Sequence, residues 1–469
     1  MKKDISVILI FLVIVTFIVR VGSFKKEHPL TYDEIVYPTL AAQISENPAN
    51  YNTIGLYNDA LKKGRELLEY FKKPLFKHPP MFSYLIVASY NLFGRTYNSA
   101  FLVSLFFGIL LIVLAYLLGS LLFDSKAGVY AAFLMSIEPI VWVSSQKIWM
   151  ETTLAFFSVL SLYLFARAIK KYNPYFMIAS GISAGLAVLT KYPGILSLVI
   201  IFVYALYSER WLFKKRSFIF SLFIPFIMIL PWLYWNYSIY GSGITSSNVE
   251  MIEILEKVLF LLQRSWVYLF AFGFVLIFSL LIKNKANIFY SNVLLPKRGV
   301  VFGVLISVFA CFIFVILRMN IVNTWIFEYV PRAGWKMGMF SKEPWYFYLG
   351  RVIELSPFYI FSILGVFLFI FDRQHLKAYS FLFLTSAIIL AFYMLWGNYQ
   401  SRYITATVIP LMVLSARTQL YMLGMVNHIK DDRVKHAAQI LFISVLAYAA
   451  IKTLLINSVF AMPNNICYF

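Results

Sequence analysis

The chain alternates between long apolar runs and short polar segments. A helix of about 20 apolar residues crosses the hydrocarbon core of a bilayer, and lipid leaves the backbone no hydrogen-bond partners outside that helix. Each run of this length therefore predicts one membrane-spanning helix. About thirteen spans are expected, at 5–23, 99–123, 127–145, 152–169, 174–190, 194–208, 217–236, 266–282, 299–317, 352–371, 378–397, 403–424 and 437–457. The predicted fold class is an all-α polytopic membrane protein.

The composition supports this class and excludes a water-soluble globular protein. Of the 469 residues, 61% are hydrophobic and 13% are charged, whereas soluble domains average roughly 45–50% apolar and about 25% charged residues. Two cysteines, Cys311 and Cys467, are too few for a disulfide framework. The first apolar run also resembles a secretory signal peptide, but we expect it to be retained, because the loop that follows needs this helix beside it.

The distribution of positive charge predicts the orientation in the membrane. The formal net charge is +20, but Lys and Arg cluster between the apolar runs rather than along one face, so nucleic acid is not an expected partner. With the N-terminus in the cytoplasm, every inner loop is short and basic, as the positive-inside rule requires. The outer side then receives the three long segments, 24–98, 237–265 and 318–351.

The first outer segment is predicted to carry juxtamembrane helices. Residues 58–73 mix Leu and Phe with Lys and Arg in a pattern typical of a helix that lies on the membrane surface. The apolar residues 79–93 are too few to span, so a second interfacial or re-entrant helix is expected there. We expect two membrane modules, 1–236 with this outer segment and 237–469 with the outer segment 318–351, and no separate soluble domain.

Two adjacent carboxylates, Asp33 and Glu34, follow the first span. Thr31 and Glu34 have the spacing of a helix capping box, in which Glu34 satisfies a backbone N–H, so a capping role and a catalytic role both stay open for Glu34. Asp33 is not needed by that motif. A carboxylate in the first helical turn is kept ionised by the helix dipole, and it could take a proton from an acceptor hydroxyl or bind a divalent metal.

Further polar side chains fall at the same outer face in the predicted topology. Lys77 and His78 precede two prolines that stiffen the entry to a helix. Glu151 begins the fourth span, and Lys191 lies in a turn between two spans. Each also has a plainer explanation, as a solvated turn residue, an acid at a helix N-terminus or an interfacial anchor. The remaining members of this outer set are Arg332, Tyr346, Tyr348 and Arg402.

Together these residues have the chemistry of sugar transfer from a lipid-linked donor. An enzyme at the outer face has no cytosolic nucleotide sugar, so a membrane-borne activated sugar is the logical donor. Its phosphate leaving group needs cations, and the attacking hydroxyl needs a base or a metal. A lipid or sugar transporter, or flippase, is the alternative. Transporters place ionisable groups at the bilayer midplane and often contain inverted repeats, whereas here nearly all spans lack charge at their middle and no repeat is evident.

Several stretches resemble membrane glycosyltransferases of the GT-C type. They are the first outer segment with its paired carboxylates, the Lys-His-Pro-Pro turn at 77–80 and the Gly-Leu-Ala-Val-Leu-Thr-Lys stretch at 185–191. The groups that they resemble are the protein O-mannosyltransferases and the 4-amino-4-deoxy-L-arabinose transferases of lipid A. The resemblance is dense over the first half of the chain and thinner beyond, where it depends on residues 343–349 and 401–410.

The resemblance implies a role for each candidate residue. Asp33 is implied to be the catalytic carboxylate, with Glu34 beside it and Glu151 at the second acidic position. Tyr346 and Tyr348 are candidates to line the substrate. Basic side chains are implied to bind the donor phosphate, with two neighbours as alternatives for one of the contacts. These phosphate-binding candidates are Lys77 or His78, Lys191, Arg332 and Arg402.

The resemblance also implies the reaction. The donor is expected to be a polyprenyl (dolichyl or undecaprenyl) phosphate sugar, transferred with inversion at its anomeric carbon. The acceptor is expected to be a hydroxyl or phosphate on a glycan, a lipid or a protein. We expect no obligatory cofactor, and a divalent metal bound by Asp33 and Glu151 stays open. The expected location is a prokaryotic plasma membrane, with the active site on the extracytoplasmic side.

Overall fold

The computed structural model describes residues 2–23, 30–62, 64, 74, 78–240, 347–368, 372–396 and 400–460. All of them belong to one packed unit, in which helices from the first half of the chain contact helices from its last quarter. Apart from an isolated bridge between Asn52 and Pro74, every regular element among these residues is a helix. This confirms the all-α class that the apolar runs predict.

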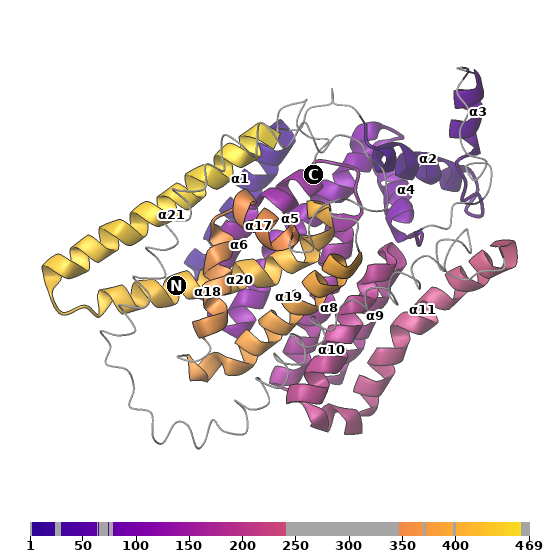
Figure 1. Ribbon diagram of the computed structural model, residues 1–469. Helices are drawn as coiled ribbons and strands as arrows, with labels where there is room; N and C mark the ends of the chain where they lie inside the picture. The colour runs from indigo at the N-terminus through magenta and orange to yellow at the C-terminus, as the bar shows by residue number, and fades with distance from the viewer. Residues whose placement is uncertain are drawn as a thin grey trace. The chain divides into compact units, whose positions relative to one another are not determined.

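The helices form two series along the chain, which Figure 1 shows from indigo to magenta and from orange to yellow. The first series is α1 (Lys2–Gly22), α2 (Tyr32–Glu46), α3 (Ile54–Lys62), α4 (Met81–Phe93), α5 (Tyr97–Leu122), α6 (Ser125–Ile137), α7 (Pro139–Ser144), α8 (Glu151–Lys170), α9 (Pro174–Thr190), the 3₁₀ helix η2 (Tyr192–Gly194), α10 (Ile195–Ser208), η3 (Arg210–Lys214) and α11 (Arg216–Tyr240). The second is α17 (Phe347–Leu355), α18 (Phe358–Leu368), η5 (Arg373–His375), α19 (Leu376–Trp396), η6 (Ser401–Ile404), α20 (Thr405–Asn427) and α21 (Asp432–Phe460).

Seven of the described helices are long and apolar enough to cross a membrane, and three shorter apolar helices accompany them. The chain is therefore an integral membrane protein with many spans. The number thirteen is not established, since the predicted spans 266–282 and 299–317 lie outside the described residues. Residues 79–93 do form a short helix, α4, but most of the amphipathic stretch predicted at 58–73 also lies outside them.

Two predicted spans are broken in the structure. The span predicted at 127–145 divides into α6 and α7 at Glu138 and Pro139. Proline lacks a backbone N–H and holds the residue before it extended, and the Glu138 carboxylate then caps α7 by accepting a hydrogen bond from the Val141 N–H at 2.8 Å. The span predicted at 352–371 is likewise divided into α17 and α18, just before and after Ser356 and Pro357.

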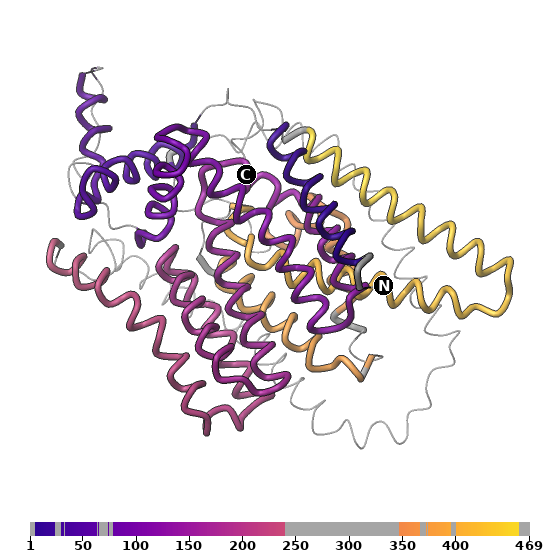
Figure 2. Tube along the Cα trace, turned by 180° about the vertical axis from the view of Figure 1, so that it is seen from behind, coloured from indigo at the N-terminus to yellow at the C-terminus, as the bar shows by residue number. Residues whose placement is uncertain are grey.

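Helix α20 joins the two series. It packs against α5, α6 and α8 from the first series and against α18 and α19 from the second. Figures 1 and 2 show it from opposite sides, among these helices. The short helix η6 precedes α20 and contacts α7. This packing carries residues 401–404 to the end of the bundle where α8 begins.

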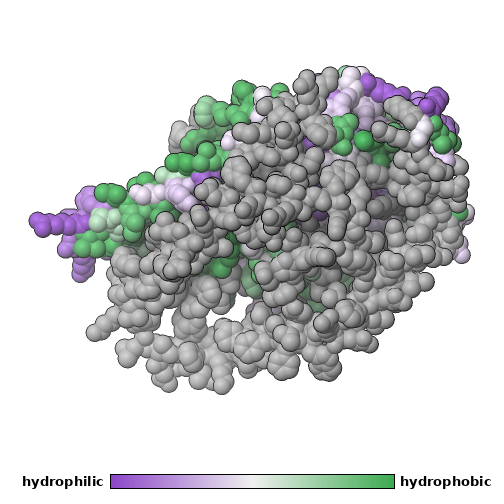
Figure 3. All heavy atoms as spheres, turned by 45° about the horizontal axis from the view of Figure 1, so that its top comes forward, coloured by the Kyte–Doolittle hydropathy of each residue, from purple (hydrophilic) through white to green (hydrophobic). Residues whose placement is uncertain are grey.

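The helices on the outside of the unit expose apolar side chains. Most of α1 and α21 is exposed, whereas α5, α8 and α20 are mostly buried. On α21 the exposed residues include Ile440, Ile443 and Leu455. Figure 3 shows green, apolar atoms along the projecting hairpin of α20 and α21 and purple, hydrophilic atoms at its tip. Such exposed apolar surface is what contact with lipid requires.

Small residues allow α5 and α6 to pack closely. A Cβ built on Gly119 would lie 2.9 Å from the Cα of Gly128, and a Cβ on Gly128 would lie 2.6 Å from the Tyr116 carbonyl oxygen. Real Cβ atoms essentially never approach other atoms so closely. These glycines therefore set the distance between the two helices, as small residues do in membrane bundles.

Gly128→Ala is expected to lower the thermal unfolding temperature in detergent, because overpacking costs about 1–3 kcal/mol. Gly350, inside α17, is the matched control, since a Cβ there meets nothing within 4 Å. Alanine stabilises a helix by roughly 0.5–1 kcal/mol relative to glycine. Gly350→Ala should thus leave the unfolding temperature unchanged or raise it. A fall with Gly350→Ala and none with Gly128→Ala would contradict this account of the packing.

Candidate active site

The first outer segment folds back through helix α2. Its N-cap is Thr31, and the predicted capping box is present, because the Glu34 carboxylate accepts a hydrogen bond from the Thr31 N–H at 2.9 Å. Asp33 and Glu34 therefore both lie in the first turn of α2. Their environments differ, since the Asp33 side chain is 20% exposed and that of Glu34 is fully buried.

The second acidic candidate, Glu151, is the first residue of α8 and is 2% exposed. Its Oε1 atom lies 3.0 Å from the Nζ atom of Lys191. Lys191 is the C-cap of α9 and is held in the turn that η2 completes. The N-terminus of α8 and the C-terminus of α9 meet because the two helices pack as an antiparallel pair. The predicted helix-end positions of both residues are thus confirmed.

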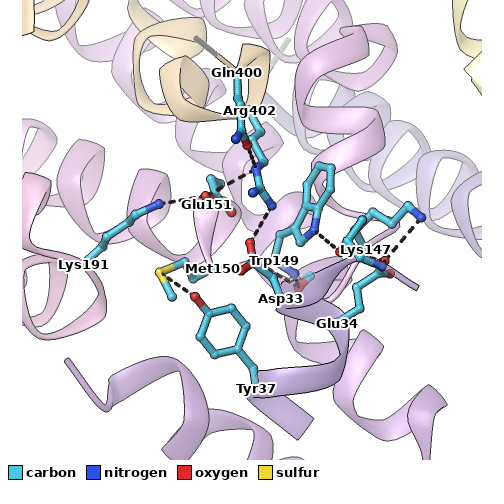
Figure 4. Close-up of polar contacts among 12 residues, drawn as sticks. Asp33, Glu34, Tyr37, Lys147, Trp149, Met150, Glu151, Lys191, Gln400 and Arg402 are labelled. Carbon is cyan, nitrogen blue, oxygen red and sulfur yellow. Dashed lines mark hydrogen bonds and ion pairs between the residues drawn. The ribbon is translucent and has the colours of Figure 1, made fainter. Parts of the chain in front are cut away.

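Arg402 connects this ion pair to Asp33. Its guanidinium lies 2.8 Å from the Asp33 carboxylate and 4.0 Å from that of Glu151. The same group lies over the Trp149 ring, 4.2 Å from its centroid, and donates a hydrogen bond to Gln400. Figure 4 shows Arg402 descending from η6 between the two carboxylates.

Four of the predicted site residues therefore converge from four distant segments. They are Asp33, Glu151, Lys191 and Arg402. Two carboxylates and two cations neutralise one another, and aromatic rings lie beside the cations, with the Lys191 ammonium 4.5 Å from the centre of the Tyr403 ring. Because buried charges are costly unless they are paired, this balance explains how the cluster is accommodated.

The charge on Lys191 is secured by its surroundings. Burial lowers the pKa of the ammonium, but the adjacent Glu151 carboxylate, with smaller contributions from Tyr403 and Asp33, raises that pKa above its ordinary value. Lys191 therefore remains protonated at neutral pH. A permanently charged lysine is suited to binding an anion.

The remaining candidates are distributed differently. The His78 carbonyl accepts a hydrogen bond from the Tyr51 hydroxyl at 3.3 Å, so His78 is held at the entry to α4. Tyr348 is fully buried, and its hydroxyl accepts a hydrogen bond from the Gln400 N–H at 3.2 Å, which supports the turn before Arg402. Its role as a substrate-lining residue stays a prediction. Lys77, Arg332 and Tyr346 lie outside the described residues.

Lys147 and Trp149 also contact this site, and no motif in the sequence indicates either of them. Lys147 is fully buried, and its ammonium lies 3.5 Å from the Glu34 carboxylate. Trp149 donates from Nε1 to the Thr31 hydroxyl at 3.1 Å. Both residues lie between two apolar runs of the sequence. The lysine could have been noticed there, because a charge at that depth needs a partner.

The described residues do not make a metal site. Among them, no group of three His, Cys, Asp or Glu side chains is close enough to hold an ion. The two carboxylates that could have bound one, Asp33 and Glu151, are paired with Arg402 and Lys191.

Comparison with solved structures identifies the fold. ArnT from Cupriavidus metallidurans bound to undecaprenyl phosphate superposes with a TM-score of 0.57 at 14% identity, over 98% of this chain and 77% of that one. The oligosaccharyltransferase AglB from Archaeoglobus fulgidus, in complex with an inhibitory peptide and a dolichol-phosphate, gives 0.59 at 17% identity, over 97% of this chain and 56% of that one. The chain has the GT-C fold.

The family comparison agrees with the fold. Residues 77–235 match the family model of dolichyl-phosphate-mannose-protein mannosyltransferases, the group that the sequence resembles. No curated protein sequence matches the chain. The matched segment contains Glu151 and Lys191, while Asp33 and Arg402 lie outside it. The chain is thus similar to this mannosyltransferase family over residues 77–235 and to ArnT and AglB in fold over nearly its whole length.

Proposed function

We propose that the chain transfers a sugar from a polyprenyl phosphate to an acceptor hydroxyl or phosphate at the extracytoplasmic membrane face. The observation that carries this proposal is the contact of Asp33 with Arg402 beside the ion pair of Glu151 and Lys191. A base for an acceptor and cations for a phosphate lie within one cluster. The undecaprenyl phosphate bound to ArnT and the dolichol-phosphate bound to AglB support the choice of donor.

Asp33 is the proposed base for a hydroxyl acceptor. It is the more exposed of the two carboxylates in the cluster, with 20% of its side chain exposed against 2% for Glu151. As the acceptor oxygen attacks the anomeric carbon, its proton passes to Asp33. The bond between that carbon and the phosphate oxygen breaks, and the electron pair leaves with the phosphate. A single displacement of this kind inverts the anomeric carbon.

Lys191 and Arg402 are the proposed partners of the phosphate. The donor is a phosphodiester with one negative charge, and the phosphate that leaves carries a second one, so cations favour the departure. Both cations are already paired with carboxylates in this cluster. A phosphate that binds Arg402 therefore competes with Asp33 for the guanidinium. Donor binding would in this way release the base when it is needed.

Glu151 has a supporting role in this proposal. One of its oxygens faces Lys191, and the other, Oε2, is buried without a hydrogen bond to any described residue. A carboxylate oxygen in such a position can stabilise the positive charge that develops on the sugar. Lys77 or His78, and Arg332, stay predictions as further contacts to the donor phosphate, and Tyr346 stays one as a substrate-lining residue. The division into modules 1–236 and 237–469 also stays a prediction.

The side of the membrane follows from the charge distribution. Lys171 lies at the end of α8 opposite Glu151, and its loop is basic, so this end is proposed to face the cytoplasm. A reporter fused after Lys171 should give a cytoplasmic signal, and one placed at the exposed Asp59 in α3 an extracytoplasmic signal. The reversed pair of signals would place the cluster on the wrong side for this proposal.

The function itself is tested with polyprenyl-phosphate sugars radiolabelled in the sugar. Membranes that contain the chain should move the label to a new acceptor and release one polyprenyl phosphate for each sugar transferred. Membranes without it should do neither. Movement of intact labelled lipid across the bilayer, with no phosphate released, would favour the flippase instead.

A further inference from the structure

We propose that Glu34 and Lys147 are positioning residues, a buried ion pair that orients α2 so that Asp33 faces Arg402. The proposal rests on the proposed function, in which Asp33 is the base. In this proposal the two adjacent carboxylates have different roles. Asp33 meets the substrate, whereas Glu34 acts only through the orientation of its neighbour.

Glu34 is fully engaged by the protein. Its Oε2 atom accepts hydrogen bonds from the N–H and the hydroxyl of Thr31, each at 2.9 Å, and lies 3.5 Å from the Lys147 ammonium. Its Oε1 atom accepts a hydrogen bond from the Tyr97 hydroxyl at 2.7 Å. The two oxygens of a carboxylate offer about four acceptor positions. Four donors from the protein surround this carboxylate and its side chain has no exposed surface, so Glu34 is not placed to meet a substrate.

Lys147 needs this carboxylate. Its side chain has no exposed surface, and removing one partner of a buried ion pair leaves an uncompensated charge that costs several kcal/mol. Lys147 lies in the segment 145–150, between the end of α7 and the beginning of α8. The pair therefore ties this segment to the beginning of α2.

The same segment contacts α2 and the site at further points. Trp149 donates to the Thr31 hydroxyl at 3.1 Å, and its ring supports the Arg402 guanidinium. The Met150 sulfur accepts a hydrogen bond from the Tyr37 hydroxyl at 3.9 Å. Figure 4 shows that Lys147, Trp149 and Met150 extend from one segment of the chain toward α2 and the Arg402 guanidinium. One short segment thus holds both the helix that carries the base and the cation that pairs with it.

The coupling between Glu34 and Asp33 follows from helix geometry. Successive side chains on an α-helix are turned by about 100°, so fixing Glu34 toward Lys147 also fixes the direction of Asp33. A misplacement of about 1 Å in a reacting group can cost about 100-fold in rate. A loose α2 should therefore lower the rate without removing any group that touches the substrate.

The test is a cycle of three variants: Glu34→Gln, Lys147→Met and both together. Glutamine keeps an acceptor for Thr31, and methionine keeps the length of the lysine side chain. Each single variant is expected to lower kcat about 100-fold per folded molecule while the KM for the donor changes less. The double variant should be about as slow as either single variant, because all three remove the same ion pair.

Glu46→Gln is the matched control, because Glu46 lies on the same helix in an exposed pair with Arg95. It should leave kcat unchanged. Wild-type kcat in Lys147→Met together with an inactive Glu34→Gln would overturn the proposal, because Glu34 would then act directly. A folded double variant whose loss of kcat is the product of the two single losses would overturn it too, because the two side chains would then act independently.

Hydrogen exchange of the amides of residues 31–37 provides a readout that does not depend on catalysis. Protection should fall in each single variant and fall no further in the double variant, even if the chain proves to catalyse another reaction. If the variants of Glu34 and Lys147 fail to fold, Tyr97→Phe tests the positioning role instead, since it removes the hydroxyl that donates a hydrogen bond to Glu34. It is expected to lower kcat about tenfold, and unchanged kcat and unchanged protection would refute the role of the pair.

Discussion

Asp33→Asn is expected to lower the rate of sugar transfer to a hydroxyl acceptor by about 10²–10⁴-fold, the usual contribution of a general base. Asparagine has nearly the same shape but cannot take the proton of the attacking hydroxyl. Binding of polyprenyl phosphate should become tighter, because Arg402 no longer has the Asp33 carboxylate at 2.8 Å as a competing partner. The turnover rate and the Kd for polyprenyl phosphate, measured on the purified protein, test the expected loss of rate and the expected gain in affinity.

Asp59→Asn is the matched control for this variant. Asp59 belongs to the same outer segment, lies on α3 and is 67% exposed in an ion pair with Lys62. The change should leave turnover and lipid binding as they are. Near-normal turnover in Asp33→Asn would remove Asp33 from the mechanism. Weaker lipid binding in that variant would contradict the competition between carboxylate and phosphate.

Arg402→Gln is expected to weaken polyprenyl phosphate binding by about 10–100-fold, because a hydrogen bond to a charged group contributes about 1.5–3 kcal/mol. Transfer should also fall, since the phosphate that leaves loses a cation and two buried carboxylates lose their common partner. Arg402→Lys should have an affinity for polyprenyl phosphate and a rate of transfer between those of Arg402→Gln and the wild type. It keeps the charge but loses the flat group that lies over Trp149.

Arg95→Gln is the control here, because Arg95 is 55% exposed and pairs only with Glu46 among the ion pairs of the described residues. It should bind polyprenyl phosphate with wild-type affinity. If Arg402→Gln also binds with wild-type affinity while remaining folded, the phosphate does not meet this guanidinium. The donor would then have to be placed elsewhere in the chain.

Local features of the fold could be predicted from the sequence because they depend on neighbours along the chain. The spacing of Thr31 and Glu34 predicts a capping box, and the box is present. An acid at the beginning of a span and a lysine at the end of another predict the positions of Glu151 and Lys191, and both are found there. Hydrophobic length likewise predicts α5 within two residues at either end.

Features that depend on packing could not be predicted in this way. Arg20 falls inside the first predicted span, where a charge is unexpected, and the structure shows it fully buried with hydrogen bonds to the Gly108 and Ser136 carbonyls and the Ser145 hydroxyl. Its partners come from three later segments. The apolar pattern shows that such a side chain must find partners, but only the packing decides which.

The candidate site shows the same division. The sequence indicates which charged residues fall at the outer face, but Asp33 and Arg402 are separated by most of the chain. Their contact depends on α20, which packs between the two helix series. Glu34 is the instructive case, because its sequence position left catalysis and capping open. Its buried contacts to Thr31, Tyr97 and Lys147 favour positioning.

The central claim is that Asp33, Glu151, Lys191 and Arg402 form one donor site for a lipid-linked phosphate. An electron cryomicroscopy structure of the protein in a lipid nanodisc with added polyprenyl phosphate tests it most directly. The account predicts the phosphate within hydrogen-bond distance of both Lys191 and Arg402, with Arg402 moved away from Asp33. A phosphate bound at the opposite end of the helices, with Arg402 still on Asp33, would contradict it.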